Sequence, residues 1–351
     1  MKYYISILLV ISFFTGAAAS HSIVLVHLGE KLPTYISDTL FQARLFNPSC
    51  EIVLLANQEA LDKHFNNQGI NIATIAIETL TKTLKHKQFI KKSALQHSQK
   101  KGNKNPAKIS SNKIDKNFWF YASERFFYLD DYIKQYNKSH VFHIENDVML
   151  YVDLEQILPV FKKNYPGIAA IFDCDDRCIP SLVYLANEKS TSRLMQCFVK
   201  YAEQGKNDMQ ILAILRQTTN ISTINSLPII MDSYCKKYSL KNALGYTVEN
   251  PTLYSKNITE FQSIFDAAAL GQFLGGIDPR NGKSVPGFIN ERCIFNPSHL
   301  TFKWIVDHMG RKVPYMIFGD EIYRINNLHI HSKKMGPFLS LNQDNGTRKA
   351  F

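Results

Sequence analysis

The feature that most constrains the fold is an alternation of short apolar runs with longer amphipathic stretches early in the chain. Ser22–His27, Glu51–Ala56 and Ile70–Ile77 have the length and β-branched composition of strands. Pro33–Phe46 and Leu61–Phe65 lie between them as helical stretches, the first opened by a proline that suits an initial helical turn. Strands that alternate with helices form βαβ units. The sequence therefore predicts an α/β fold with a mainly parallel central sheet flanked by helices.

The alternation continues after residue 117, and the last third, around residues 275–298, is irregular. Further helices are expected at 118–133, 154–161, 188–203 and 207–217, and further strands at 140–144 and 167–172. Gly29 is the only glycine directly after the first strand, so neither a GxGxxG dinucleotide fold nor a phosphate-loop NTPase is supported. The 351 residues, 45% of them hydrophobic, are enough for one large, well-buried domain.

Residues 1–19 have the pattern of a secretory signal peptide. Lys2 precedes an apolar run that ends in small residues near Ala19. An uncleaved anchor is the alternative, although the run is shorter than the roughly 20 residues of a membrane-spanning helix. In a secretory compartment, the six cysteines allow one to three disulfides, and four Asn-X-Ser/Thr sequons make a glycoprotein possible. The sequons begin at Asn137, Asn220, Asn257 and Asn345.

Nearly all of the formal charge of +11 comes from residues 82–116, which hold 11 lysines and a single acidic residue, Asp115. We expect a solvated surface loop there. Weak contact with an anionic surface, such as an acidic glycan or a membrane, is the alternative. Nucleic-acid binding is not expected, because Phe89 is the only aromatic residue among these lysines.

The segment HIENDVMLY, residues 143–151, carries the clearest chemistry. In extended chain, Glu145 and Asp147 project to the same side at the end of an apolar strand. Two carboxylates at the carboxyl end of a parallel strand offer hard oxygen ligands for Mn²⁺ or Mg²⁺. A charged turn without a metal is the alternative. Near the C-terminus, His329, His331 and Lys333 share one face if HIHSK is extended, and could add an imidazole ligand and a diphosphate-binding ammonium.

These segments resemble GT-A glycosyltransferases. HIENDVMLY is similar to their acidic metal-binding motif, HIHSK to the C-terminal histidine segment that closes such sites, and the opening strand, the Pro33 helix and EIVLLAN to the nucleotide-binding half. The likeness covers roughly residues 21–335 and implies a GT-A-like fold. It implies Asp147 as the firm metal ligand and His329 or His331 as a third. Glu145 stands where the family has aspartate, so it contacts the metal directly or acts through water or ribose.

The resemblance also implies roles for residues outside the two motifs. The base and ribose would lie over His27, Gly29 and Asn57, and Lys333 near the diphosphate. Arg125 would face the nucleotide, with a structural arginine as the alternative.

The segment 265–276 combines small residues with Asp266 and Gln272 in an apolar run. In an inverting enzyme Asp266 would deprotonate the acceptor hydroxyl. In a retaining enzyme Gln272 or Asp266 would lie behind the anomeric carbon. The alternative is that Asp266 caps a packed Ala/Gly helix.

We therefore expect a catalytic domain over residues 20–340, with a nucleotide-binding half at 20–150, an acceptor-binding half at 151–340 and a tail at 341–351. The expected activity is metal-dependent transfer of a sugar from a nucleotide-sugar donor to a glycan, glycoprotein or glycolipid. The expected location is the secretory pathway or a Golgi-like lumen, with export if the signal is cleaved. The alternatives are a nucleotidyl- or phosphotransferase that uses a divalent cation, and a non-catalytic secreted carbohydrate-binding protein.

Overall fold

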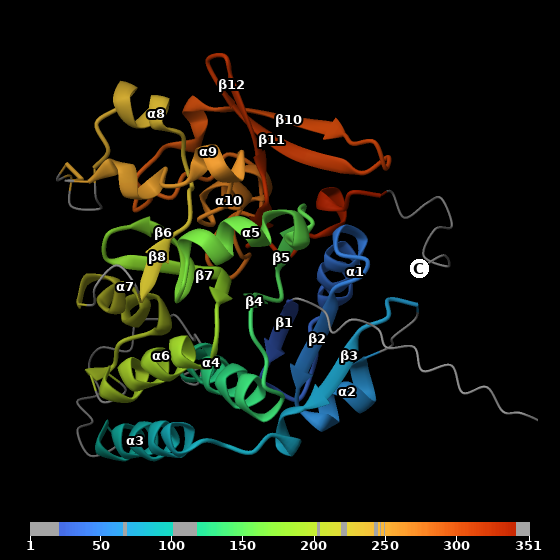
Figure 1. Ribbon diagram of the computed structural model, residues 1–351, viewed down its shortest axis with the longest axis vertical. Coiled ribbons are helices and arrows are strands. Elements are labelled where there is room, and N and C mark those ends of the chain that lie inside the picture. The colour runs from blue at the N-terminus through green and yellow to red at the C-terminus, as the bar shows by residue number, and fades with distance from the viewer. Residues whose placement is uncertain are drawn as a thin grey trace, which may run out of the picture.

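A seven-stranded sheet forms the centre of the computed structural model, in the order β3-β2-β1-β4-β7-β6-β8 (Figure 1). The strands are β1 (Ser22–His27), β2 (Glu51–Ala56), β3 (Ala73–Ala76), β4 (Val141–Ile144), β6 (Ile168–Cys174), β7 (Arg177–Leu185) and β8 (Ile224–Ser226). All neighbouring strands pair in parallel except β7, which runs antiparallel to β4 and β6. The expected α/β fold with a mainly parallel sheet flanked by helices is confirmed. The structure describes residues 21–341 apart from 66–68, 101–117, 202–203, 219–222, 242–244, 246 and 249.

Helices connect and cover these strands (Figure 1). They are α1 (Ile36–Phe46), α2 (Gln58–His64), α3 (Leu84–Lys100), α4 (Phe118–Gln135), α5 (Leu154–Asn164), α6 (Glu188–Tyr201), α7 (Asp208–Thr218), α8 (Asp232–Lys237), α9 (Ile258–Phe261) and α10 (Ala269–Gly275). Short 3-10 turns lie at Ile77–Thr79, Pro251–Tyr254, Pro297–His299 and Gly336–Phe338. No helix among the described residues has both the length and the apolar character needed to cross a membrane.

Two smaller sheets add the C-terminal part of the chain to this core. β5 (Val148–Leu150) pairs antiparallel with β13 (Asn327–His329). A four-stranded sheet has the order β10 (Thr301–Val306), β11 (Lys312–Phe318), β12 (Glu321–Ile325), β9 (Ser263–Ile264). The pairing of β5 with β13 brings residues near position 148 beside residues near position 329.

The expectation of a surface loop at residues 82–116 is wrong for its first half, which forms helix α3. Phe89 is only 3% exposed and stacks on Phe127 of α4, with ring centroids 4.4 Å apart. His86 is fully buried, with Nδ1 2.6 Å from an Asp131 oxygen and Nε2 3.4 Å from a Glu124 oxygen. Burial opposes protonation of His86, but the two carboxylates outweigh it and raise its pKa. Residues 101–116 lie outside the described residues.

All six cysteines lie in the described part of the chain, and all are free thiols, so none of the possible disulfides is present. The predicted signal peptide, the sequons at Asn220 and Asn345, and the tail from residue 342 lie outside the described residues.

Candidate active site

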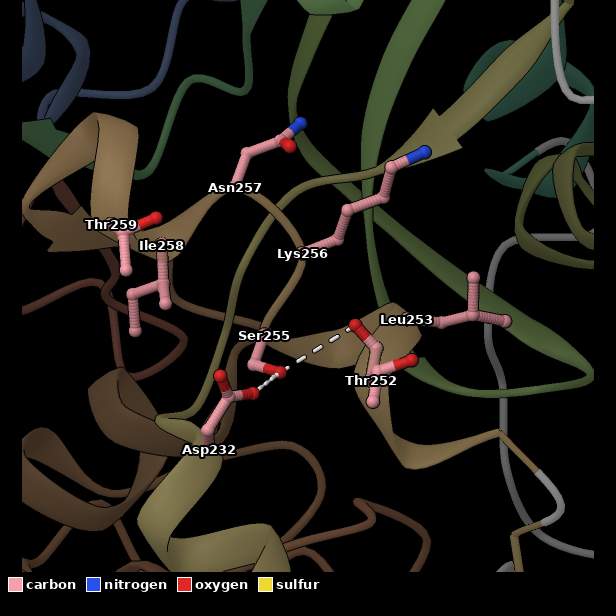
Figure 2. Close-up of a pocket in the computed structure, with 8 residues that line it drawn as sticks. All are labelled: Asp232, Thr252, Leu253, Ser255, Lys256, Asn257, Ile258 and Thr259. Carbon is pink, nitrogen blue, oxygen red and sulfur yellow. Dashed lines mark hydrogen bonds between the residues drawn. The ribbon is translucent and has the colours of Figure 1, made fainter.

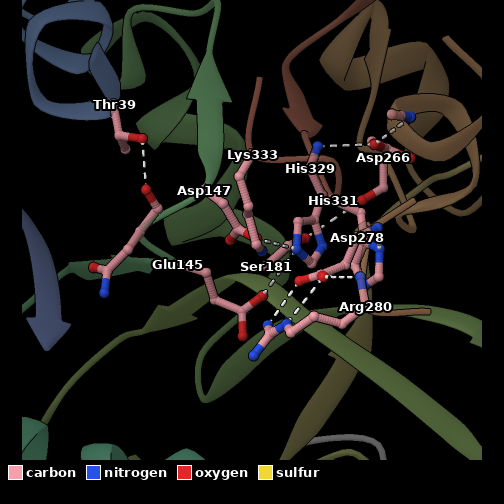
Figure 3. Close-up of polar contacts among 12 residues, drawn as sticks. Thr39, Glu145, Asp147, Ser181, Asp266, Asp278, Arg280, His329, His331 and Lys333 are labelled. Carbon is pink, nitrogen blue, oxygen red and sulfur yellow. Dashed lines mark hydrogen bonds and ion pairs between the residues drawn. The ribbon is translucent and has the colours of Figure 1, made fainter. Parts of the chain in front are cut away.

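The acidic segment and the C-terminal histidine segment meet at the carboxyl end of β4. The Ile330 amide donates to the Asp147 carbonyl (2.9 Å), next to the β5–β13 pairing that sets His329 opposite Val148. The Glu145 amide donates to the carbonyl of Ser181 on β7 (3.0 Å). Backbone contacts on both sides therefore determine where the two carboxylates point (Figure 3).

Glu145, Asp147 and His329 form a cluster suited to a divalent metal. His329 Nε2 lies 3.1 Å from Asp147 Oδ2 and 3.7 Å from Glu145 Oε2. One ligand atom from each residue lies within 4.8 Å of the others. Two carboxylate oxygens and one imidazole nitrogen suit Mn²⁺ and, less well, Mg²⁺, and they leave coordination positions for substrate phosphates. The residues fit the metal that the sequence implied.

Arg125 of α4 holds Glu145 in its charged form. It donates to Glu145 Oε1 (2.5 Å) and to Asp208 Oδ2 (2.8 Å). Burial acts to raise the pKa of Glu145, but the guanidinium outweighs it and lowers that pKa to about 2. Burial dominates at Asp208, where it raises the pKa to about 6 against the opposing effect of Arg125. The structure thus places Arg125 against the acidic motif.

Asp208 is a site residue that the sequence analysis missed. Its side chain is 3% exposed, and its Oδ1 has no hydrogen-bond partner among the described residues. The only sequence signal was its position in the first turn of helix α7, which is equally typical of a capping residue.

Lys333 and His331 occupy different positions although they lie two residues apart. The Lys333 ammonium pairs with Asp147 Oδ2, and burial lowers the pKa of Lys333 to about 8. Lys333 adopts a left-handed backbone conformation (φ +63°), which directs its side chain back to the acidic motif. His331 instead accepts a hydrogen bond at Nδ1 from the Asp278 amide (2.9 Å), and burial lowers its pKa to about 4. Of the two histidines, only His329 reaches the carboxylates (Figure 3).

Three of the five predicted nucleotide-binding residues, His27, Gly29 and Asn57, lie at the ends of β1 and β2. Asn146, between the two carboxylates in the chain, donates to His27 Nδ1 (3.3 Å). Asn57 accepts a hydrogen bond at Oδ1 from the Gly29 amide (2.8 Å). Thr39 of α1 donates to the Asn146 carbonyl (2.7 Å), which fixes the turn from the other side (Figure 3). His27 therefore contacts the acidic motif, whereas Gly29 and Asn57 are joined to each other at the ends of the neighbouring strands.

Asp266 is fully buried, and both carboxylate oxygens accept backbone hydrogen bonds. Oδ1 accepts from Leu270, and Oδ2 accepts from Gly271 and from His329, each at 2.9 Å. Burial raises the pKa of Asp266 to about 6 against the effect of these donors. Such contacts match the capping interpretation and also fix the backbone of His329. Gln272 lies within α10, and its buried Oε1 has no hydrogen-bond partner among the described residues.

A separate polar pocket of about 400 Å³ is lined by Asp232 and by residues 252, 253 and 255–259 (Figure 2). Within it, Ser255 pairs with Asp232 and lies 3.5 Å from the Thr252 carbonyl. It shares no lining residue with the metal cluster, so we assign the chemistry to the cluster and not to this pocket.

No protein-family model matches the chain, and no curated protein matches it in sequence. Among solved structures it is similar to mouse xyloside xylosyltransferase 1, with 7% identity, a TM-score of 0.38, and coverage of 59% of this chain and 85% of that one. It is also similar to core-mannan synthase A of Aspergillus fumigatus in a Mn/GDP form. The identity is 9%, the TM-score is 0.35, and the match covers 60% of this chain and 73% of that one. A third similar structure is a cytidylyltransferase of Leptospira borgpetersenii, with 12% identity, a TM-score of 0.35, and coverage of 60% of this chain and 76% of that one. Because these values are low, we base function on the geometry of the site.

Proposed function

We propose that this chain is a metal-dependent glycosyltransferase that moves a sugar from a nucleotide diphosphate donor to an acceptor. The observation that carries the proposal is the convergence of Glu145, Asp147, His329 and Lys333 at the carboxyl end of β4. Open α/β sheets bind ligands at that edge. Hard oxygen ligands together with a nearby ammonium suit a cation–diphosphate complex.

The residues divide the work by their contacts. Asp147 and His329 would hold the ion, and Arg125 keeps Glu145 ionised and directed at it. A divalent ion bound there supplies Lewis-acid stabilisation for the leaving diphosphate. When the donor binds, Lys333 would leave its ion pair with Asp147 and pair with a diphosphate oxygen instead, so that one anionic partner replaces another.

The remaining residues position the reactants. His27, Gly29 and Asn57 would border the base and ribose, since they lie at the ends of β1 and β2 and His27 contacts Asn146 of the acidic motif. Gln272 presents an amide oxygen that no described residue engages, which suits a sugar hydroxyl. Asp266 would act as a positioning residue, because its oxygens already accept the amides of α10 and of His329.

Partner classes and location follow from the same proposal. The acceptor would be a glycan, glycoprotein or glycolipid. A signal at residues 1–19 would bring the enzyme to a secretory lumen, where nucleotide sugars are supplied.

Thermal-shift titration tests this function. Nucleotide sugars should raise the melting temperature more than plain nucleotides do, and only when Mn²⁺ is present. Asp147→Asn should abolish both this shift and donor turnover without unfolding the protein. The exposed Asp320→Asn, in the turn between β11 and β12, is the matched control.

Each outcome separates one class of function. Stabilisation by nucleoside triphosphates alone would favour a nucleotidyl- or phosphotransferase. Stabilisation by free sugars without a metal would favour a carbohydrate-binding protein. Near-normal turnover by Asp147→Asn would refute the metal site.

A further inference from the structure

Exposed apolar side chains gather on two segments of the C-terminal part. One is the irregular loop 279–292, with Val285 54% exposed and Phe288 and Ile289 also exposed. The other is the ribbon of β10 and β11, which extends from the body of the molecule (Figure 1). On this ribbon Val306 is 61% and Met309 65% exposed, and Trp304 and Ile305 are exposed as well. We call the two segments together the apolar rim.

The two segments meet at the end of helix α10. A side chain at Gly276 would collide with the backbone of Val285, so the loop lies directly on the helix end. The Gly287 amide donates to the Phe273 carbonyl (2.7 Å), and Phe273 packs against Phe302 of β10 (5.8 Å between centroids). The apolar rim is therefore one continuous neighbourhood and not two scattered groups.

The apolar rim adjoins the candidate active site. Helix α10 packs on the His329 carbonyl at Gly271 and on the loop at Gly276. Those positions are five residues apart, about 7.5 Å along a helix axis. The loop begins one residue after Asp278, whose amide donates to His331 Nδ1. The loop half of the rim therefore lies near the candidate site, whereas the tip of the ribbon packs beside the C-terminal end of α1, where Arg311 donates to the Leu45 carbonyl (3.0 Å).

Positive charge accompanies the apolar side chains. Residues 278–292, 301–312 and 334 contain seven basic side chains and three acidic ones. Three of the basic side chains already have acidic partners, because Arg280 pairs with Asp278, Arg311 with Asp307 and Arg292 with Asp176. Lys283, Lys303 and Lys334 are exposed around the apolar residues. A partner that combines an apolar layer with negative charge complements this surface.

We propose that the apolar rim docks on the surface of a bilayer that contains anionic lipids. Exposed Trp, Met and aliphatic side chains at a ribbon tip, together with lysines, suit the boundary between headgroups and acyl chains. A second copy of the chain fits less well. The edge strand β10 carries Lys303 in its middle, and a lysine on an edge opposes strand pairing between molecules.

Docking in this orientation defines the acceptor class. The metal cluster would face a membrane-displayed acceptor, a glycolipid rather than a soluble glycan or protein. This part of the inference rests on the proposed function, whereas membrane docking itself does not.

Vesicle sedimentation of the full chain tests the docking. Wild type should bind vesicles of phosphatidylcholine mixed with phosphatidylserine more tightly than vesicles of phosphatidylcholine alone, and added salt should weaken the difference. Val306→Asp and Met309→Asp should each weaken binding about 10-fold or more, because each removes an apolar side chain from the lipid boundary. Tyr136→Asp, 43% exposed just after α4 and outside the basic stretch 82–116, is the matched control and should bind as wild type does. Any contribution from residues 1–20 is common to all of these chains.

Two results would overturn the docking proposal. One is equal vesicle binding by wild type and both rim variants. The other is a concentration-dependent dimer that Val306→Asp abolishes, which would make a second copy the occupant. Metal-dependent donor hydrolysis, measured on the same samples in solution, should be unchanged in the rim variants. Vesicle binding without any hydrolysis would reject the proposed function and leave the docking intact.

Discussion

The substitution Gly271→Ala tests whether helix α10 sets the position of His329. A β-carbon built on Gly271 lies 2.9 Å from Asp266 Oδ2 and closer still to the His329 carbonyl oxygen. His329 is held from the other side by the β5 pairing, and Asp266 is tied to the helix and to the strand by the amides of Leu270 and His329. To admit the methyl group, strand and helix must separate by roughly 1 Å in an interior that is otherwise close-packed.

Stability should fall moderately and activity strongly. Overpacking costs about 1–3 kcal/mol, and more where backbone must move, as the His329 carbonyl must here; the preference for alanine over glycine in a helix, about 1 kcal/mol, offsets only part of this loss. Displacing a metal ligand by roughly 1 Å can lower turnover about 100-fold. We therefore expect a folded protein with much lower turnover and a higher Mn²⁺ requirement.

Urea unfolding and donor hydrolysis titrated with Mn²⁺ measure the two effects on the same preparation. Gly336→Ala is the matched control, because no atom of a described residue other than its chain neighbours lies within 4 Å of its added β-carbon. Unchanged turnover and Mn²⁺ requirement in Gly271→Ala would refute the role assigned to the α10 contact.

Three further predictions follow from single contacts. Replacing His86 by Gln should lower the free energy of unfolding most below pH 6.5 and progressively less above it. The pKa of His86 is raised in the folded protein, so its stabilising effect is lost as the pH rises through that folded-state pKa. Urea unfolding across this pH range measures the effect. His329→Ala should raise the Mn²⁺ concentration needed for half-maximal turnover, whereas His331→Ala should behave as an indirect change, costing about 10–100-fold or less; equal metal requirements in both would exclude His329 as a ligand. Lys333→Met should weaken nucleoside diphosphate binding while tightening Mn²⁺ binding without nucleotide, since the ammonium now pairs with Asp147; calorimetry with each ligand separates the two effects.

The strands and helices of the nucleotide-binding part were predictable because their patterns are local. β1 and β2 coincide with the predicted runs, and β4 differs by one residue at its start. Helix α3 was not predictable in this way. Its lysines obscured an apolar face on which Phe89 and His86 meet partners from α4. Strand β7 was also missed, because its charged start at Arg177 resembles a turn.

The metal ligands were predictable for a different reason. Glu145 and Asp147 were predicted together because they lie two residues apart at the end of a strand. The chain between them is a turn and not extended, since the Val148 amide donates to the Glu145 carbonyl (3.2 Å), yet both carboxylates reach His329. Which histidine joins them is decided by contacts that no local pattern contains. His329 and Asp147 are separated by 182 residues, and the Asp278 amide that engages His331 comes from 53 residues away. The sequence therefore indicated two candidate imidazoles, and the fold brings one of them to the carboxylates.

The charges around the site show why long-range contacts matter for function as well as for fold. In isolation, two adjacent carboxylates repel each other and favour protonation of one of them. Here Arg125 comes from α4 and Lys333 from beyond β13, so each carboxylate meets its own cation before any metal binds. Arg125 also pairs with Asp208 and is largely buried. Lys333 is more exposed, and burial lowers its pKa, so it gives up its charge more readily. The arrangement therefore assigns the fixed cation to Glu145 and the exchangeable one to Asp147, the carboxylate that must release its partner for a metal to bind.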